Sequence, residues 1–455
     1  MTVVRPKNAP LPESDSSAQS TARRNLRRSS LGNRLDHLRE STTIRNAGSL
    51  YATTILTSTF GFFYWLIAAR TMPADSVGTA NALQSAAQLC AVLFLSGLGT
   101  LTVSELGIRP NQAKQIILTN AIVAGAAAGI GSAVFAAVLI TAPNGLHDQL
   151  RSPPIAILLV MLTAVTGALL VLDDGCIGLL RGNIQLRRNA VFAVVKLALL
   201  PVATSVLSVA AGLPVLASWL TGATVSLIVA LLLLRRAVPL GEWSTDFGWL
   251  ARNWRLAAGH HWLNVSIVGP DYVMPVLVAA IVGPAANAKF AMALLVIGFV
   301  NIIPYHLSTA LFALRYGDED SLREECRLSL RICFVVAGMS GIFFLFASHL
   351  ILREFRPSYT SATHAMQIMG FSIFPSAIKA HYVAIARVKG RMSQAAGRST
   401  LTAAVIVAAG VIGAFLGGLN GVAIASLASH CFEGLVFGPT VLSVIRSPAR
   451  TPSVA

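Results

Sequence analysis

Twelve mostly apolar stretches, each about 20 residues long, follow one another between residues 47 and 445. A run of this length is what a helix needs to cross a lipid bilayer. Charged residues make up only 12% of the 455 residues, about half the share found in soluble globular domains. Because so few charges cannot cover a soluble protein of this size, the sequence excludes an ordinary cytosolic enzyme and predicts an all-α membrane protein.

The predicted spans fall into two sets of six. The first six cover residues 47–69, 79–101, 116–142, 153–172, 191–211 and 213–234, and the second six cover 258–281, 290–314, 332–352, 362–386, 400–418 and 421–445. The boundaries define an N-terminal lobe (47–234), a cytoplasmic linker (235–257) and a C-terminal lobe (258–445), flanked by a basic, disordered tail (1–46) and a short tail (446–455).

The distribution of basic residues predicts the orientation. Most of the 35 lysines and arginines fall in segments that share one side of the membrane if both termini are cytoplasmic, as the positive-inside rule requires. The net charge of +16 therefore reports topology, and no nucleic-acid partner is predicted. The arginines of the first tail are expected to contact anionic membrane lipids. The five cysteines are isolated in sequence, so neither a metal site nor a cofactor is expected.

A weak internal repeat supports two similar lobes. Residues 68–83 align without a gap on residues 279–294, with seven of sixteen positions identical. Both stretches follow the first span of their set, and six spans per copy give the two copies the same orientation in the membrane. Two six-helix lobes around a central cavity are the predicted architecture.

Short motifs after the first span resemble a transporter family. Arg70 ends the span, and Pro73 and Gly78 precede the next one. This pattern is similar to the bacterial polysaccharide transporter family, the oligosaccharide flippases of the multidrug/oligosaccharidyl-lipid/polysaccharide exporter superfamily. Residues 96–99 (SGLG) and 179–182 (LLRG) add to the resemblance, whereas residues 287–290 depart from it by lacking the family's Gly and Tyr. The loop at 105–115 lacks the Asp-Arg-x-Gly-Arg motif of major facilitator proteins.

The resemblance implies a function without covalent chemistry. It predicts a flippase in the cytoplasmic (inner) membrane that moves a polyprenyl-diphosphate-linked oligosaccharide outward by alternating access, for cell-surface polysaccharide biosynthesis. Glycosyltransferases of the same pathway would be partners. An ion-coupled transporter of a small solute or drug is the alternative. A membrane-embedded glycosyltransferase is disfavoured, because the predicted outside loops are short.

Two lysines lie within predicted spans, where a charge normally faces a cavity or a partner. Lys196 and Lys379 are candidate ligands for a diphosphate, together with Arg70 and Asn264; snorkelling towards the membrane surface is the alternative for both lysines. Asp271, Glu433 and His430 are candidates for coupling to a proton or sodium gradient, and a Lys379–Glu433 ion pair is a further possibility. Asp173 and Asp174 are expected to be solvated, and Tyr64, Trp65 and Tyr359 to be interfacial anchors.

Overall fold

The computed structural model describes residues 42–95, 97–141, 143–237, 243–311 and 319–446. The predicted tail 1–46 lies almost entirely outside the described residues, as does 447–455. Every regular element in the described part is helical. Ten helices are long and apolar enough to cross a membrane, and a bent pair of shorter helices makes an eleventh candidate span. Apolar side chains on their outer surfaces, such as Phe346 and Leu416, are 83% exposed, as expected of side chains that face lipid.

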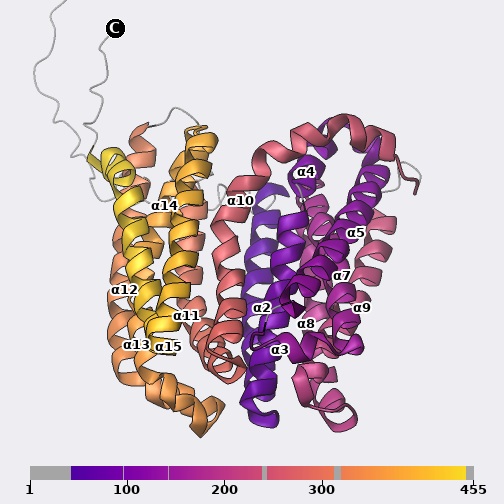
Figure 1. Cartoon of the computed structure of the whole chain (residues 1–455). Coiled ribbons are helices and arrows are strands. Elements are labelled where there is room, and N and C mark those ends of the chain that lie inside the picture. The colour runs from indigo at the N-terminus through magenta and orange to yellow at the C-terminus, as the bar shows by residue number, and fades with distance from the viewer. Residues whose placement is uncertain (1–41, 96, 142, 238–242, 312–318, 447–455) are drawn as a thin grey trace, which may run out of the picture.

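The helices form two groups that lie side by side (Figure 1). The N-terminal lobe contains α2 (Thr42–Thr71), α3 (Ala74–Phe94), α4 (Leu98–Ile108), α5 (Ala113–Ile140), α6 (His147–Leu150), α7 (Pro153–Gly178), α8 (Gly182–Val206) and α9 (Leu213–Ala237), with 3-10 turns at Pro110–Gln112 and Ala210–Gly212. The C-terminal lobe contains α10 (Phe247–Ile281), α11 (Pro284–Ala310), α12 (Glu319–Phe355), the 3-10 turn Pro357–Ala362, α13 (Thr363–Gly370), α14 (Ile373–Val388) and α15 (Met392–Arg446).

The last helix accounts for two of the predicted spans. Within α15 the backbone leaves the helical region at Gly417 and Gly418, and Gly418 has a φ of +53°, a value that glycine adopts without strain. The two arms pack closely, because a Cβ on Gly413 would lie 2.4 Å from the carbonyl oxygen of Gly421. Counted as two arms, α15 brings the total to the twelve predicted spans.

Three predicted boundaries need correction. The span at 362–386 is broken into α13 and α14, which are bent by 46°. The span at 79–101 crosses the break between α3 and α4. Within the predicted linker 235–257, α9 continues to Ala237 and α10 begins at Phe247. Trp249 and Leu250 of α10 are buried against α4 and α5, and this packing extends the helix beyond the apolar run.

The lobes are pressed together at one end of the molecule, where the α2–α3 turn meets the α10–α11 turn. A Cβ on Gly78 would lie 1.7 Å from the carbonyl oxygen of Pro284, and the buried side chain of Asn287 donates a hydrogen bond of 2.8 Å to the carbonyl oxygen of Gly78. These turns contain the two copies of the sequence repeat. We call this contact, made by residues 73–81 and 284–288, the closed end.

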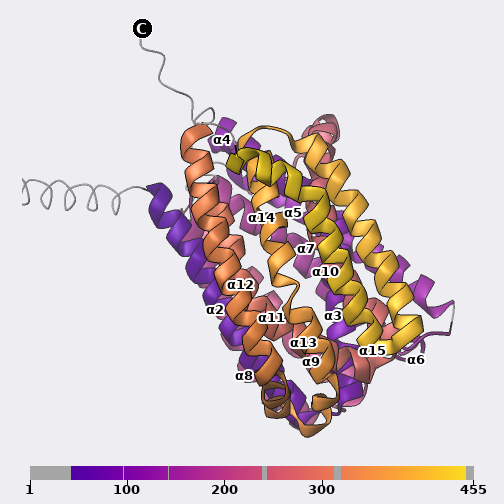
Figure 2. The same cartoon turned by 90° about the vertical axis from the view of Figure 1, so that its left-hand side faces the viewer.

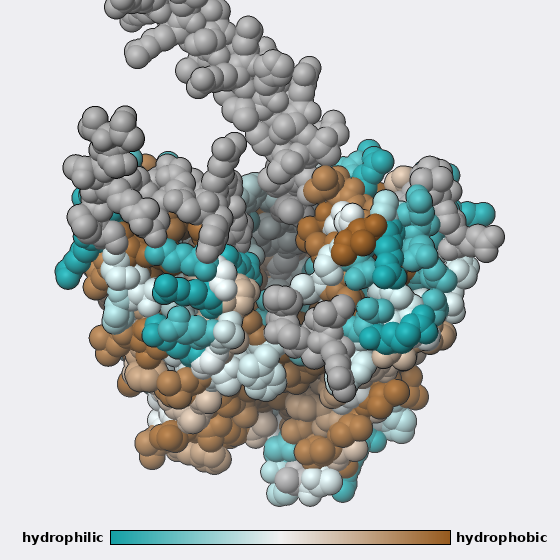
Figure 3. All heavy atoms as spheres, turned by 90° about the horizontal axis from the view of Figure 1, so that it is seen from above, coloured by the Kyte–Doolittle hydropathy of each residue, from teal (hydrophilic) through white to brown (hydrophobic). Residues whose placement is uncertain are grey.

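The opposite end carries the last helical turn of α15 and the start of α2 (Figures 1 and 2). Seen from this end, polar side chains gather on both lobes (Figure 3). We call it the open end.

Candidate functional site

A cavity of about 690 Å³ lies between the lobes, within the size range of small-molecule sites. The N-terminal lobe supplies Trp65 of α2 and Asn81 and Ser85 of α3. Most of the lining comes from α10, α11, α14 and the second arm of α15. Uncharged polar and aromatic side chains are prominent in it: Asn264, Tyr272, Asn301, Tyr305, Ser308, Ser372, Ser376 and Ser426.

Helix α10 brings two of the predicted site residues to the cavity. Asn264 and Asp271 both line it and both are exposed to it. Pro270 and Pro275 lie inside the same helix, and each removes a backbone donor from the middle of the span. Asp271 forms no hydrogen bond or ion pair with any other described residue. A carboxylate without a partner in the middle of a membrane span is a candidate functional group.

A buried carboxylate on α15 holds two neighbours. Glu433 is fully buried; its Oε1 lies 2.9 Å from Nζ of Lys379 on α14, and its Oε2 lies 2.9 Å from Nδ1 of His430. Lys379 and His430 also line the cavity, as Asp271 does. The structure therefore shows the Lys379–Glu433 pair that the sequence left as one of two possibilities. We call Asp271, Lys379, His430 and Glu433 the C-lobe cluster.

Lys196 does not join this cluster. Its side chain is buried within the N-terminal lobe, where Nζ lies 4.0, 4.5 and 5.1 Å from the ring centroids of Trp219, Phe192 and Tyr64. Such cation–π contacts stabilise an ammonium group without a carboxylate. Lys196 is absent from the cavity lining, and three aromatic rings occupy the space around its charge.

We expect Lys196→Met to leave transport at the wild-type rate. The loss of cation–π attraction and the removal of a buried charge oppose each other, so the free energy of unfolding should stay within about 1 kcal/mol of wild type. Thermal unfolding of the purified variant and a transport assay check both statements. A variant that folds normally but has lost transport would show that this ammonium group takes part after all.

Arg70 is also placed away from the cavity. It lies at the C-terminal end of α2, near the closed end, where Nη2 is 3.0 Å from Oε2 of Glu354 on α12 and Nε donates to the Glu354 carbonyl oxygen at 2.8 Å. Arg356 donates to the Met72 carbonyl oxygen at 2.9 Å. These contacts join the two lobes, so Arg70 belongs to the contact between them and not to the cavity lining.

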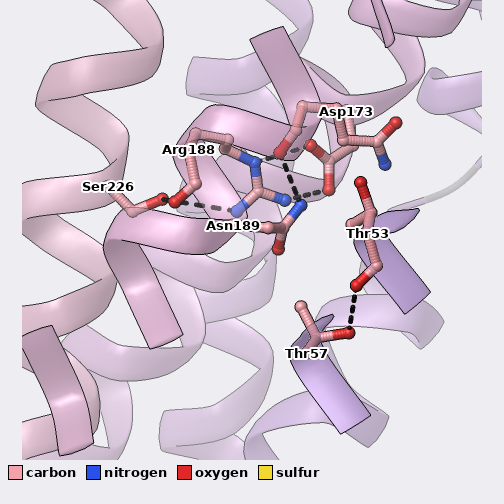
Figure 4. Close-up of polar contacts among 7 residues, drawn as sticks. Thr53, Thr57, Asp173, Arg188, Asn189 and Ser226 are labelled. Carbon is pink, nitrogen blue, oxygen red and sulfur yellow. Dashed lines mark hydrogen bonds and ion pairs between the residues drawn. The ribbon is translucent and has the colours of Figure 1, made fainter. Parts of the chain in front are cut away.

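Several residues interpreted as surface groups are buried. Tyr64 and Tyr359 are fully buried and Trp65 is 6% exposed, so none of them is an interfacial anchor. Asp173 is not solvated either, because Nε of Arg188 donates to its Oδ1 at 2.6 Å and Nη2 of Arg188 also contacts it. Ser226 completes this group by donating to the Arg188 carbonyl oxygen at 2.9 Å (Figure 4). The pair joins α7 and α8 inside the N-terminal lobe.

The fold has clear structural relatives, although no protein-family model and no curated protein sequence matches the chain. The inward-facing structure of a multidrug resistance MATE family transporter of the MOP superfamily has 13% identity and a TM-score of 0.61, covering 88% of this chain and all of the other. A MOP superfamily transporter from Pyrococcus furiosus, whose binding pocket of reverse polarity suggests a different function, has 12% identity and a TM-score of 0.61, covering 89% and 96%.

A third relative is the MATE transporter VcmN from Vibrio cholerae, in a mutant form, with 18% identity and a TM-score of 0.51, covering 90% of this chain and 99% of the other. At these identities the likeness concerns the fold. The chain is a multi-pass membrane protein with the two-lobed, all-helical fold of MOP superfamily transporters. The fold is the one that the sequence resemblance implies, and the narrower flippase family stays a prediction.

Proposed function

We propose that the chain is an alternating-access membrane transporter, with no covalent chemistry, whose substrate occupies the cavity between the lobes. The observation that carries the proposal is the contrast between a closed end, where backbone meets backbone at Gly78 and Pro284, and a cavity that extends to Arg387 near the other end of α14. With both termini cytoplasmic, as the basic residues predict, the cavity is open to the cytoplasm.

The proposed substrate is a saccharide linked to a polyprenyl diphosphate, moved across the cytoplasmic membrane for cell-surface polysaccharide biosynthesis. Amide and hydroxyl side chains beside aromatic rings suit a polyhydroxylated, uncharged ligand, because they form hydrogen bonds and stack without requiring a charge. Asn264, Asn301 and Tyr305 supply such groups. Lys379 and Arg387 are the basic residues of the lining and are assigned to the diphosphate. Glycosyltransferases that build the saccharide are the expected partners.

An ion-coupled transporter of a small solute or drug is the second candidate. Asp271 favours it, since a carboxylate in the cavity wall without a hydrogen-bond or ion-pair partner among the described residues attracts an organic cation. The relatives of similar fold include multidrug transporters, which is in line with this alternative.

Translocation in proteoliposomes distinguishes the two candidates. The purified protein is reconstituted with a fluorescent polyprenyl-diphosphate oligosaccharide, and the label accessible from outside is followed over time; uptake of a cationic dye is measured in parallel. The flippase proposal predicts that the oligosaccharide becomes accessible only when protein is present and that the dye does not accumulate. Dye accumulation without oligosaccharide translocation would overturn it in favour of the second candidate.

In either case the C-lobe cluster is the proposed site of ion coupling. Glu433 lies 2.9 Å from both Lys379 and His430, and Asp271 lines the same cavity, which supports this role. An ion that binds here and changes the charge of the cavity wall links the ion gradient to the movement of the lobes.

A further inference from the structure

Asn81 of α3 belongs both to the cavity and to the contact that closes it. It lines the cavity between the lobes, and its Oδ1 accepts a hydrogen bond of 3.3 Å from Nδ2 of Asn287 across the closed end. Asn264 and Asn301, the other asparagines of the lining, form no hydrogen bond to the N-terminal lobe within the described part of the chain. A ligand that reaches Asn81 therefore meets a side chain that holds the two lobes together.

Asn287 of α11 is fully buried and uses both hydrogens of its amide nitrogen. Nδ2 donates to the carbonyl oxygen of Gly78 at 2.8 Å and to Oδ1 of Asn81 at 3.3 Å. Because Gly78 offers an acceptor, the Asn287 side chain must turn its nitrogen towards the N-terminal lobe. Its own Oδ1 is buried without a hydrogen-bond partner among the described residues, so this residue has no spare partner if one of the two bonds is lost.

The two bonds of Asn287 differ in strength. The bond to Gly78 has an ordinary length, whereas the bond to Asn81 is longer than the roughly 2.7–3.2 Å usual for N–H···O bonds. A donor that reaches Oδ1 of Asn81 from the cavity at a shorter distance therefore competes with Asn287. Nδ2 of Asn81 forms no hydrogen bond with any other described residue, so the same side chain can also donate to a ligand.

The surroundings of Asn81 favour an uncharged ligand group. The N-terminal lobe supplies Trp65, Asn81 and Ser85 to the lining, and none of the three carries a charge. The basic side chains of the lining, Lys379 and Arg387, come from α14 of the other lobe. A hydroxyl group both donates and accepts, as a primary amide does, whereas the oxygens of a fully ionised phosphate only accept. Hydroxyl groups of a saccharide match Asn81 better than the diphosphate does.

We infer that Asn81 contacts a hydroxyl group of the transported saccharide, and that this contact weakens the bond from Asn287 and favours separation of the lobes at the closed end. The inference rests on the proposed oligosaccharide transport and adds the residue that senses the saccharide. When a ligand takes over Oδ1 of Asn81, one hydrogen of the buried Asn287 amide loses its partner, which is unfavourable while the residue stays buried. Separation of the lobes exposes Asn287 to water and removes this penalty, so ligand binding shifts the population towards separated lobes.

Binding of two lipids that differ only in the saccharide tests the contact. The purified protein is titrated with a polyprenyl-diphosphate oligosaccharide that is fluorescently labelled on the lipid, and with the same labelled polyprenyl diphosphate without sugar. We expect Asn81→Ala and Asn81→Leu to weaken binding of the first lipid about fivefold, the effect of one hydrogen bond between uncharged groups, and to leave binding of the second unchanged. Asn253→Ala is the matched control, because Asn253 of α10 bonds to its own helix and lies outside the lining; it should change neither affinity.

Distances across the closed end test the effect on the lobes. Spin labels are placed on cysteines at Asp75 and Ser358, two exposed positions on different lobes at this end, in a background where the exposed Cys431 is replaced by serine. The oligosaccharide lipid should raise the ratio of separated to closed lobes by about threefold, within the effect of one hydrogen bond, and the lipid without sugar should not. In Asn81→Ala the two lipids should give the same ratio. Without any lipid this variant should already exceed the wild-type ratio, because Asn287 has lost an acceptor.

Equal affinity of the wild type for the two lipids, normal binding of the oligosaccharide lipid by both Asn81 variants, or a closed-end ratio that does not respond to the saccharide would each overturn the inference. The flippase assay is a separate measurement. A wild type that translocates the oligosaccharide while the Asn81 variants bind it normally refutes the inference alone, whereas a wild type that accumulates the dye and does not translocate the oligosaccharide refutes the proposed function.

Discussion

Replacement of Glu433 by alanine is expected to destabilise the protein by about 3–5 kcal/mol, the usual penalty for removing one partner of a buried ion pair. Glu433 is fully buried, and its two oxygens are the partners of Lys379 and His430. Without it, the ammonium group of Lys379, which is 16% exposed, stays in the cavity wall with its charge uncompensated.

Thermal and denaturant unfolding in detergent measure this loss, and a double-mutant cycle assigns it to the pair. Lys379→Met together with Glu433→Ala should recover much of the stability lost in the single Glu433→Ala variant, because the double variant buries neither charge. If Glu433→Ala and Lys379→Met destabilise additively, the two side chains do not interact and the description of the C-lobe cluster is wrong.

Gly78→Val is expected to hold the transporter in an arrangement in which the lobes are separated at the closed end. Transport should fall at least tenfold. The Cβ that the substitution adds would lie 1.7 Å from the Pro284 carbonyl oxygen and 2.9 Å from the Ala288 amide nitrogen. Both neighbours are backbone atoms of the other lobe, so no side-chain rotation relieves the overlap, and the lobes must separate.

Gly61→Val is the matched control, because a Cβ on Gly61 of α2 meets nothing within 4 Å. Cysteine accessibility at Asn81, measured with a membrane-impermeant thiol reagent added on the side of the membrane that the closed end faces, should rise in the Gly78 variant and stay low in the control. Normal transport by Gly78→Val would show that the contact between the lobes can be lost without consequence.

The number of spans and their division into two lobes could be predicted from the sequence, because each crossing needs its own apolar run. The breaks inside the spans could not be predicted from the sequence. The bend between α13 and α14 and the start of α10 at Phe247 depend on packing against neighbouring helices, as the burial of Trp249 shows. The hairpin of α15 was predictable because Gly417 and Gly418 separate its two apolar arms.

The charged residues of the candidate site could be predicted from the sequence, but its uncharged polar residues could not. Asp271, Lys379 and Glu433 are conspicuous as charges within apolar runs; in the structure Lys379 and Glu433 form an ion pair, and Asp271 lines the same cavity as Lys379. In the sequence, Lys196 and Lys379 are both single lysines within apolar spans. The partners of Lys196 are aromatic rings, and a hydropathy pattern does not show whether an aromatic side chain contacts a charge or only packs in the core. Asn81, Asn301 and Ser426 were missed, because isolated polar residues on separate helices show no spacing pattern before the helices are packed.

A reducible crosslink across the closed end tests the central claim, that transport requires the lobes to separate there. The side chains of Asn81 and Asn287 are 3.3 Å apart across the lobe contact, so cysteines at both positions, with Cys431 replaced by serine, can be joined by oxidation or by a short disulfide-containing reagent. In proteoliposomes we expect oligosaccharide translocation to stop when the crosslink forms and to recover when the same sample is reduced. Unchanged translocation by fully crosslinked protein would contradict alternating access through this cavity.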